Sequence, residues 1–198
     1  MGSSRAEKTR ERILESGMDV LLGEEATSVS LRQVASAAGI TPMAIYRHFD
    51  DKEALELALL DHAFGVFESY LAETAATGSA SDRLDALAGR FFDFALEREA
   101  HFRFLFFSSV RPASGGRGSE VRSISRPTFL LLKNALGDWS DERSADIEDL
   151  NQLTIDVLAF CVGQVALVVS GNLNHPARQK KRRYMEAFRR LLADMGSD

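Results

Sequence analysis

The chain has 198 residues, of which 45% are hydrophobic and 27% are charged, and its formal net charge is −5. A chain of this size and composition can bury a substantial core. The acidic balance does not exclude a nucleic-acid partner, because salt screens charges beyond roughly 10 Å and only the local field matters. The single Cys161 excludes an internal disulfide, and nothing suggests an oxidising compartment.

The N-terminal residues, MGSSRAEKTRER, are polar and lack the apolar core of a signal peptide. The longest apolar segment, residues 153–169, contains Asp156 and Gln164 and is interrupted too soon for a bilayer span. We therefore expect a cytoplasmic protein without a membrane partner. Few prolines and few alternating β-branched runs predict an all-α fold of about nine helices.

Three helices are predicted in the first fifty residues. Apolar residues recur at spacings of three and four over residues 5–22, which predicts an amphipathic first helix. Ser30 is placed to cap a short second helix, and Gly39 ends it where a left-handed turn favours a residue without a β-carbon. Thr41 and Pro42 are typical of a helix start, so a third helix is predicted from Pro42 to Phe49. Two helices joined by so short a turn indicate a helix-turn-helix.

The third helix should present a basic and aromatic face to solvent. If Ile45 and Phe49 point inward, the helical rotation of about 100° per residue makes Met43 and Arg47 point outward. Ala44 then lies on one shoulder, with Tyr46 and His48 on the flanks. A helix of this width fits the major groove, where the arginine can bind guanine or a phosphate.

A fourth helix is predicted to begin just after this face. Asp50 or Asp51 is expected to cap it, and Lys52 lies in its first turn. Free backbone N–H groups and a cation together form an anion site, for which a DNA phosphate is the natural occupant.

The segment LRQVASAAGITPMAIYRHFDDKEAL resembles the DNA-binding domain of the TetR (tetracycline-repressor) family of bacterial transcriptional regulators. The resemblance covers roughly residues 5–60 and implies a DNA-binding domain over residues 1–52 and a helical ligand-binding and dimerisation domain over residues 53–198. In that family the third helix reads the major groove, and the tyrosine and the lysine that opens the fourth helix hold the backbone. The DNA-binding residues so implied are Ser30, Arg32, Thr41, Pro42, Met43, Ala44, Tyr46, Arg47, His48 and Lys52.

The remaining chain shows further helical segments. They are predicted at 52–76, at 82–99 with Ser81 or Asp82 as the cap, at 100–110, at 120–136 with Pro127 breaking or kinking the middle, and at about 142–170 and 176–195. Residues 111–119 are predicted to form a flexible loop.

Aromatic side chains are dense between residues 91 and 107, which is compatible either with ordinary core or with a pocket for a hydrophobic or aromatic molecule. Candidate ligand-binding residues are Phe91, Phe94, His101, Phe106, Phe129, Cys161 and Gln164. For Cys161 a core position is the simpler interpretation, and Gln164 is also compatible with a contact across a subunit interface. No cofactor is expected.

The helix predicted at 142–170 is apolar around much of its girth and should be buried on more than one side. The family resemblance implies a homodimer through the last two helices, which would bind a palindromic double-stranded DNA operator. The leading hypothesis is a repressor that a small-molecule effector releases from this operator. The alternative hypothesis is an activator or an architectural DNA-binding protein without an effector, which would bind DNA through the same third helix. A small helical enzyme is a remote alternative, because no catalytic or metal-binding motif is present.

Overall fold

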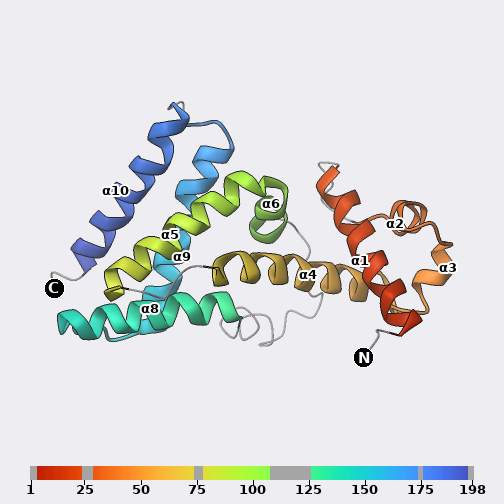
Figure 1. The fold of residues 1–198 in the computed structure, drawn as a ribbon, viewed down its shortest axis with the longest axis horizontal. Coiled ribbons are helices and arrows are strands. Elements are labelled where there is room, and N and C mark those ends of the chain that lie inside the picture. Colours follow the sequence, from red (N-terminus) through yellow and green to blue (C-terminus); the bar gives the residue numbers. More distant parts are fainter. Residues whose placement is uncertain (1–3, 24–28, 74–77, 108–125, 174–175, 196–198) are drawn as a thin grey trace. The chain divides into compact units, whose positions relative to one another are not determined.

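The computed structural model of the chain describes residues 4–23, 29–73, 78–107, 126–173 and 176–195. All regular secondary structure in these ranges is helical (Figure 1), and the nine helices found there confirm the all-α expectation. The helices form two compact units. One boundary between them falls inside a long helix, between residues 66 and 67, and another falls between residues 99 and 100, where the chain returns to the first unit. The functional division expected between residues 52 and 53 stays a prediction.

The first unit contains α1 (Arg5–Gly23), α2 (Leu31–Ala37), α3 (Pro42–Ile45), the first part of α4 (Lys52–Ala72) and α6 (Glu99–Phe107). Its core is continuous across all five helices. The fully buried members include Ile13, Val34, Ile45 and Leu59, and α6 contributes Phe104. Removing this apolar surface from water holds the short α2 and α3 in place, since helices of one or two turns are not stable alone.

Side-chain hydrogen bonds cap the N-termini of two helices in this unit. The backbone N–H of Gln33 donates to the Ser30 hydroxyl at 3.5 Å, so Ser30 caps α2 as expected. The backbone N–H of Ala54 donates to the Asp51 carboxylate at 2.7 Å, so Asp51 caps α4. The predicted third helix was too long, because regular helix ends at Ile45 and residues 46–48 form a turn.

The turn between α2 and α3 depends on Gly39, whose φ is +65°. Its N–H donates to the carbonyl of Ser36, and the next N–H, of Ile40, reaches back to the carbonyl of Ala35 at 2.9 Å. This is the left-handed ending of a helix that a residue without a β-carbon adopts most readily.

We expect Gly39→Ala to lower the free energy of unfolding by about 1–2 kcal/mol through backbone strain alone. An added β-carbon would meet no heavy atom within 4 Å, so a steric clash makes no contribution. Urea unfolding of both proteins measures the difference. Gly23→Ala, another position with open space for a β-carbon but without the left-handed φ, is the control. Equal losses in the two variants would contradict the strain argument.

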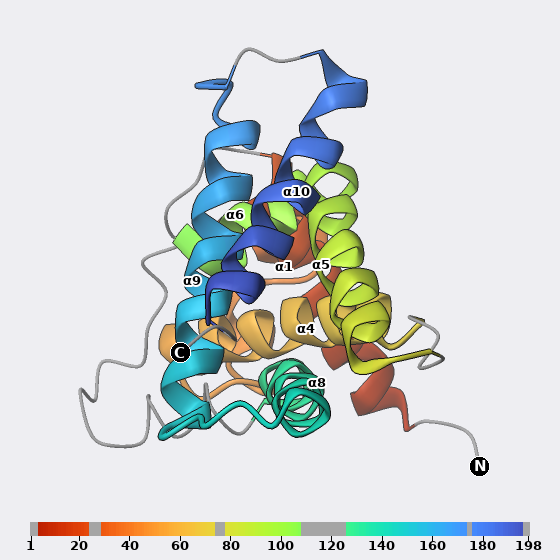
Figure 2. The ribbon, with the colours of Figure 1, turned by 90° about the vertical axis from the view of Figure 1, so that its left-hand side faces the viewer.

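The second unit contains the end of α4 with α5 (Ala80–Glu97), α8 (Pro127–Arg143), α9 (Leu150–Val169) and α10 (Ala177–Met195). Helix α5 packs against α8, α9 and α10. Figure 2 shows α9 and α10 side by side, with α8 seen nearly end-on because it crosses them. The largest fully buried side chains of this unit are Trp139, Phe92, Phe94, Phe188, Leu84 and Leu136. The guanidinium of Arg143 lies 4.9 Å from the centre of the Trp139 ring.

Two helix starts in this unit differ from the prediction. Helix α5 begins at Ala80 and is capped by Ser79, while Asp82 accepts a hydrogen bond from the Ser79 N–H at 3.0 Å. The two residues form a capping box, which lowers the pKa of Asp82 chiefly through the Ser79 hydroxyl. Pro127 does not kink a helix; it occupies the first position of α8, where its missing N–H has no cost.

Two further boundaries also differ. Helix α8 continues to Arg143 and ends at Ser144 in a left-handed conformation, with φ of 53°. Helix α9 therefore starts only at Leu150, where the Asp149 carboxylate accepts hydrogen bonds from the N–H groups of Asn151 and Gln152. Helix α4 ends at Ala72 rather than residue 76, and α10 agrees closely with its prediction. The loop predicted at 111–119 and residues 120–125 lie outside the described residues.

Helix α9 is shorter than the segment predicted at about 142–170, but the expectation that this segment is interrupted too soon for a bilayer span is wrong by length and composition. Among the described residues it is the one helix that satisfies the length and composition of a membrane span, despite Asp156 and Gln164. Only 33% of the most apolar 18-residue stretch of α9 is buried within the chain, although the helix packs on α5, α8 and α10. A substantial apolar surface of this helix therefore remains available to a partner.

Candidate functional site

The third helix exposes the side predicted to read DNA. Met43 retains 71% of its accessible surface, whereas Ile45 retains 1%. Arg47 is exposed on the turn that follows, and no acidic side chain of the described residues pairs with it. Tyr46 is also exposed. The structure thus presents a thioether, a phenol and a guanidinium together on one exposed segment.

Phe49 anchors this turn from below and is buried with 5% of its surface accessible. The guanidinium of Arg10, on α1, lies 5.0 Å from the centre of its ring. A cation over an aromatic face is attractive, so α1 helps to fix the end of this turn. Sequence reasoning missed this pair, because the two residues are far apart along the chain.

The other predicted DNA-binding residues surround the same turn. Thr41, Pro42 and Arg32 are exposed, while Ser30, Ala44 and His48 are half-buried. Thr41 precedes α3 in an extended conformation, but its side chain makes no capping hydrogen bond. Its hydroxyl is therefore available to another acceptor or donor.

Lys52 has a partner that sequence reasoning did not include. Its ammonium lies 3.3 Å from the carboxylate of Glu56, one turn further along α4. The lysine side chain is 47% exposed and the glutamate side chain 18% exposed, and the pair contributes little, since exposed ion pairs at this spacing are worth about 0.3–0.5 kcal/mol. A phosphate at the start of α4 would compete with Glu56 for this cation, and the anion site stays a prediction.

A cavity of about 640 Å³ lies in the second unit between the end of α4, α5 and α8. Its wall is predominantly apolar and includes Leu71, Ala72, Leu87, Pro127, Leu131 and Ala135. Three charged residues also line it, namely Glu68, Arg83 and Asp138. This volume and mixture are typical of a small-molecule pocket.

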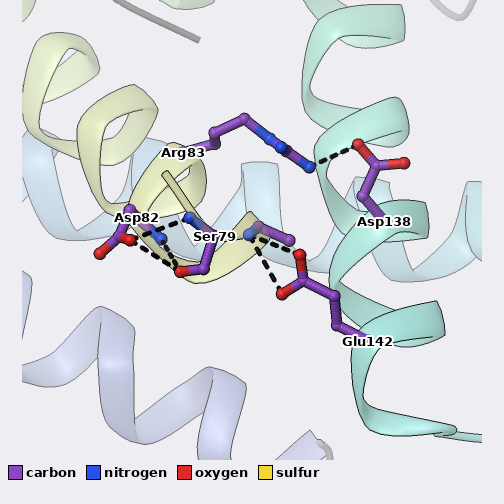
Figure 3. Close-up of polar contacts among 6 residues, drawn as sticks. Ser79, Asp82, Arg83, Asp138 and Glu142 are labelled. Atoms are coloured by element: carbon purple, nitrogen blue, oxygen red, sulfur yellow. Dashed lines mark hydrogen bonds and ion pairs between the residues drawn. The ribbon is translucent and has the colours of Figure 1, made fainter. Parts of the chain in front are cut away.

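Two polar contacts hold α8 against α5 beside this cavity (Figure 3). The guanidinium of Arg83 donates to the Asp138 carboxylate at 2.6 Å. The Glu142 carboxylate accepts the backbone N–H of Ala80 through both oxygens, at 3.0 and 3.1 Å. Because the N–H groups of a first helical turn lack internal partners, Glu142 supplies from α8 an acceptor that α5 needs.

The predicted ligand-binding residues do not line this cavity. Phe91, Phe94, Phe129 and Cys161 are buried in the second unit, and Gln164 is half-buried on α9. His101 and Phe106 lie on α6 and belong to the first unit. No local sequence pattern marks the cavity residues as ligand-binding. Leu131, for example, is exposed, but it belongs to an apolar run that is equally typical of a core helix.

Cys161 lies beside Tyr184 in the core between α9 and α10. Burial raises the pKa of its thiol to about 11, so the thiol is protonated at neutral pH and is a poor nucleophile or metal ligand. The described residues contain no group of three or more His, Cys, Asp or Glu side chains that would hold a metal ion.

The end of α4 is fixed to α5 by Tyr70. Its hydroxyl donates to the Glu97 carboxylate at 2.8 Å, and the Arg90 guanidinium lies 3.8 Å from the ring centre. Burial, and then the hydrogen bond and charge of Glu97, raise the pKa of Tyr70 from 10.0 to about 12.

This shift predicts a pH dependence of stability. The folded state holds the phenol proton more tightly than the unfolded state, so its stabilising effect is complete below pH 10 and is lost as the pH rises through about 12. We expect the unfolding free energy of the wild type to fall more steeply over this window than that of Tyr70→Phe. Urea unfolding at several pH values measures both curves, and parallel curves would contradict the prediction.

Comparison with known proteins agrees with this architecture. Residues 13–59 match the family model described as bacterial regulatory proteins, tetR family. Residues 84–195, more than half of the chain, match the model of a tetracyclin repressor-like C-terminal domain. The chain belongs to the TetR family. The resemblance stated from the reading helix therefore extends to the C-terminal helices.

Individual relatives share limited sequence identity with this chain. An uncharacterized HTH-type transcriptional regulator of Haemophilus influenzae is 30% identical over 120 residues, which cover 60% of this chain. The match spans 58% of the length of that curated relative. A bacterial regulatory protein in the tetR family from Rhodococcus RHA1 has the same fold, with a TM-score of 0.68, 17% identity and coverage of 94% of this chain and 97% of that one. The fatty acid degradation regulator FadR from Bacillus halodurans has a TM-score of 0.68 at 14% identity, over 90% of this chain and 96% of its own.

Proposed function

We propose that this TetR-family protein is a cytoplasmic repressor that binds a palindromic DNA operator as a homodimer and is released by a small-molecule effector. The observation that carries the DNA-binding part is the opposite exposure of neighbouring residues in α3. Met43 is accessible and Ile45 is buried, so the accessible side of the helix is free to enter a major groove. Arg47 adds a cation at the same face, and no acidic side chain in the described part of the chain pairs with it.

Supporting contacts to the DNA backbone come from around this helix. Thr41 and Tyr46 offer hydroxyl groups, and Lys52 offers an ammonium at the start of α4. Contacts of this kind position a protein on DNA, whereas contacts of the reading helix with base edges select the sequence.

The exposed surface of α9 supports the homodimer. Ile155 and Leu167 retain 45% and 43% of their accessible surface, and exposed Ala159 and Gly163 lie between them. At Gly163 an added β-carbon would meet nothing within 4 Å. Small residues between two larger apolar ones allow a second helix to approach closely, which suits a copy of the same helix.

The cavity beside α4 supports regulation by an effector. Helix α4 begins with Lys52, close to the predicted DNA-binding residues. Its last turns contribute four residues to the cavity wall, namely Glu68, Ser69, Leu71 and Ala72. A ligand that repacks this wall therefore acts on the helix that also follows the reading turn. Near-complete release requires the ligand to bind the released arrangement about 10⁴-fold more tightly than the DNA-bound one.

The test is a gel-shift titration of the full-length protein with duplex DNA from upstream of its own operon. We expect sequence-specific binding at moderate salt, with unlabelled upstream DNA competing better than random DNA of the same length. Equal competition by random DNA would reject a sequence-specific regulator.

A further inference from the structure

We propose that the cavity between α4, α5 and α8 binds an amphipathic carboxylate, whose head group replaces Asp138 on Arg83 and whose apolar chain lies along α8. The inference deepens the effector part of the proposed function and rests on it. It names the class of molecule that the cavity takes.

The apolar wall sets the body of the ligand. The lining residues of α8 run from Pro127 to Asp138, a separation of about 16 Å along the helix axis. Between the two ends, Leu131 and Ala135 of α8 and Leu87 of α5 present hydrocarbon to the cavity. When a hydrocarbon chain binds here, its apolar surface and that of the wall are both removed from water, which stabilises the complex.

The charged end of the wall sets the head group. Arg83 is the only cation among the described residues that line the cavity, and its side chain is 26% exposed while that of its partner Asp138 is 58% exposed. An incoming carboxylate can take over the planar guanidinium, which matches carboxylate geometry. The displaced Asp138 then returns to water at low cost, because it is already largely hydrated.

A cationic head group is disfavoured by the same comparison. A cationic ligand that paired with Asp138 would leave the less exposed Arg83 without its ion-pair partner. Leaving a partly buried charge unpaired costs desolvation free energy. The other lining carboxylate, Glu68, is already engaged in an interaction within the chain. Exchange at Arg83 is therefore the less costly replacement.

Exchange at Arg83 also loosens one of the contacts between α8 and α5. The contact of Glu142 with the first turn of α5 remains, so α8 keeps an attachment near its end when Asp138 is released. A carboxylate thus alters the wall of the cavity without detaching the helix.

The experiment compares three probes of equal chain length, octanoate, octanol and octylammonium, by calorimetric titration of the full-length protein without DNA. We expect octanoate to bind about tenfold more tightly than octanol, and octylammonium no more tightly than octanol. Arg83→Gln should reduce octanoate binding to the octanol level. Asp138→Asn should strengthen octanoate binding about three- to tenfold, because it removes the competing carboxylate. Octanol binding should not change in either variant.

The matched control is Arg189→Gln, which breaks a comparable ion pair with Asp85, 2.8 Å long, between α10 and α5. It should leave all three affinities unchanged. The inference is overturned if octanoate binds no better than octanol, if octylammonium binds best, or if Asp138→Asn fails to strengthen octanoate binding. This last variant keeps both Arg83 and Glu142, so it tests the exchange even if Arg83→Gln does not fold.

The gel shift without any probe separates this inference from the proposed function. Sequence-specific DNA binding combined with no preference for octanoate would refute only the carboxylate. Absence of sequence-specific DNA binding would refute the regulator, whatever the cavity binds.

Discussion

Arg47→Ala is expected to weaken operator binding by about 1–3 kcal/mol at each half-site, which doubles in a symmetric dimer and amounts to at least a tenfold loss. The exposed guanidinium has no ion-pair partner within the described residues, so its removal leaves the fold unchanged. Gel-shift titrations of wild type and variant measure the loss. Arg98→Ala, which removes an exposed arginine after α5 in the second unit, is the control for net charge.

Salt dependence then assigns the contact that Arg47 makes. If it holds a phosphate, the slope of log affinity against log salt falls by about 0.9 per half-site in Arg47→Ala. If it binds a base edge, the slope is nearly unchanged and discrimination at one operator position is lost. Unchanged operator affinity would remove Arg47 from the interface.

The largest effect is expected from the double variant Ile155→Lys, Leu167→Lys on α9. Both side chains are exposed in the single chain, so two lysines leave the monomer folded but place charges within the proposed apolar interface. We expect a monomer by sedimentation and a loss of operator affinity of about 10²–10⁴-fold, because the second half-site is no longer tethered to the first.

Leu130→Lys is the matched control, because Leu130 on α8 is also 43% exposed. It should leave the dimer and its operator affinity intact. A double variant that remained dimeric would show that α9 does not form the subunit interface.

The exposed face of α3 was predictable because its signals are local. Gly39, Thr41 and Pro42 define a turn and a helix start within a few residues, and the helical rotation then decides which side of α3 is exposed. The length of α3 was not predictable in the same way. The backbone leaves the regular helix after Ile45, although Phe49 still packs inward as its spacing indicated.

The cavity was not predictable, because its charged end joins residues that are 55 positions apart. Neither Arg83 nor Asp138 has a neighbour in the sequence that distinguishes it from a solvated charge. The start of α5 was missed for a related reason. Ser79 and Ser81 are both plausible caps, and only the hydrogen bonds between Ser79 and Asp82 decide between them.

Trp139 is the only tryptophan of the chain and is buried on α8, directly after the residue that pairs with Arg83. The cation of Arg143 lies over its ring. The protein therefore carries a buried intrinsic fluorophore one residue after Asp138 of the cavity wall, and we expect a shift or quenching of its emission to report ligand occupancy without any label.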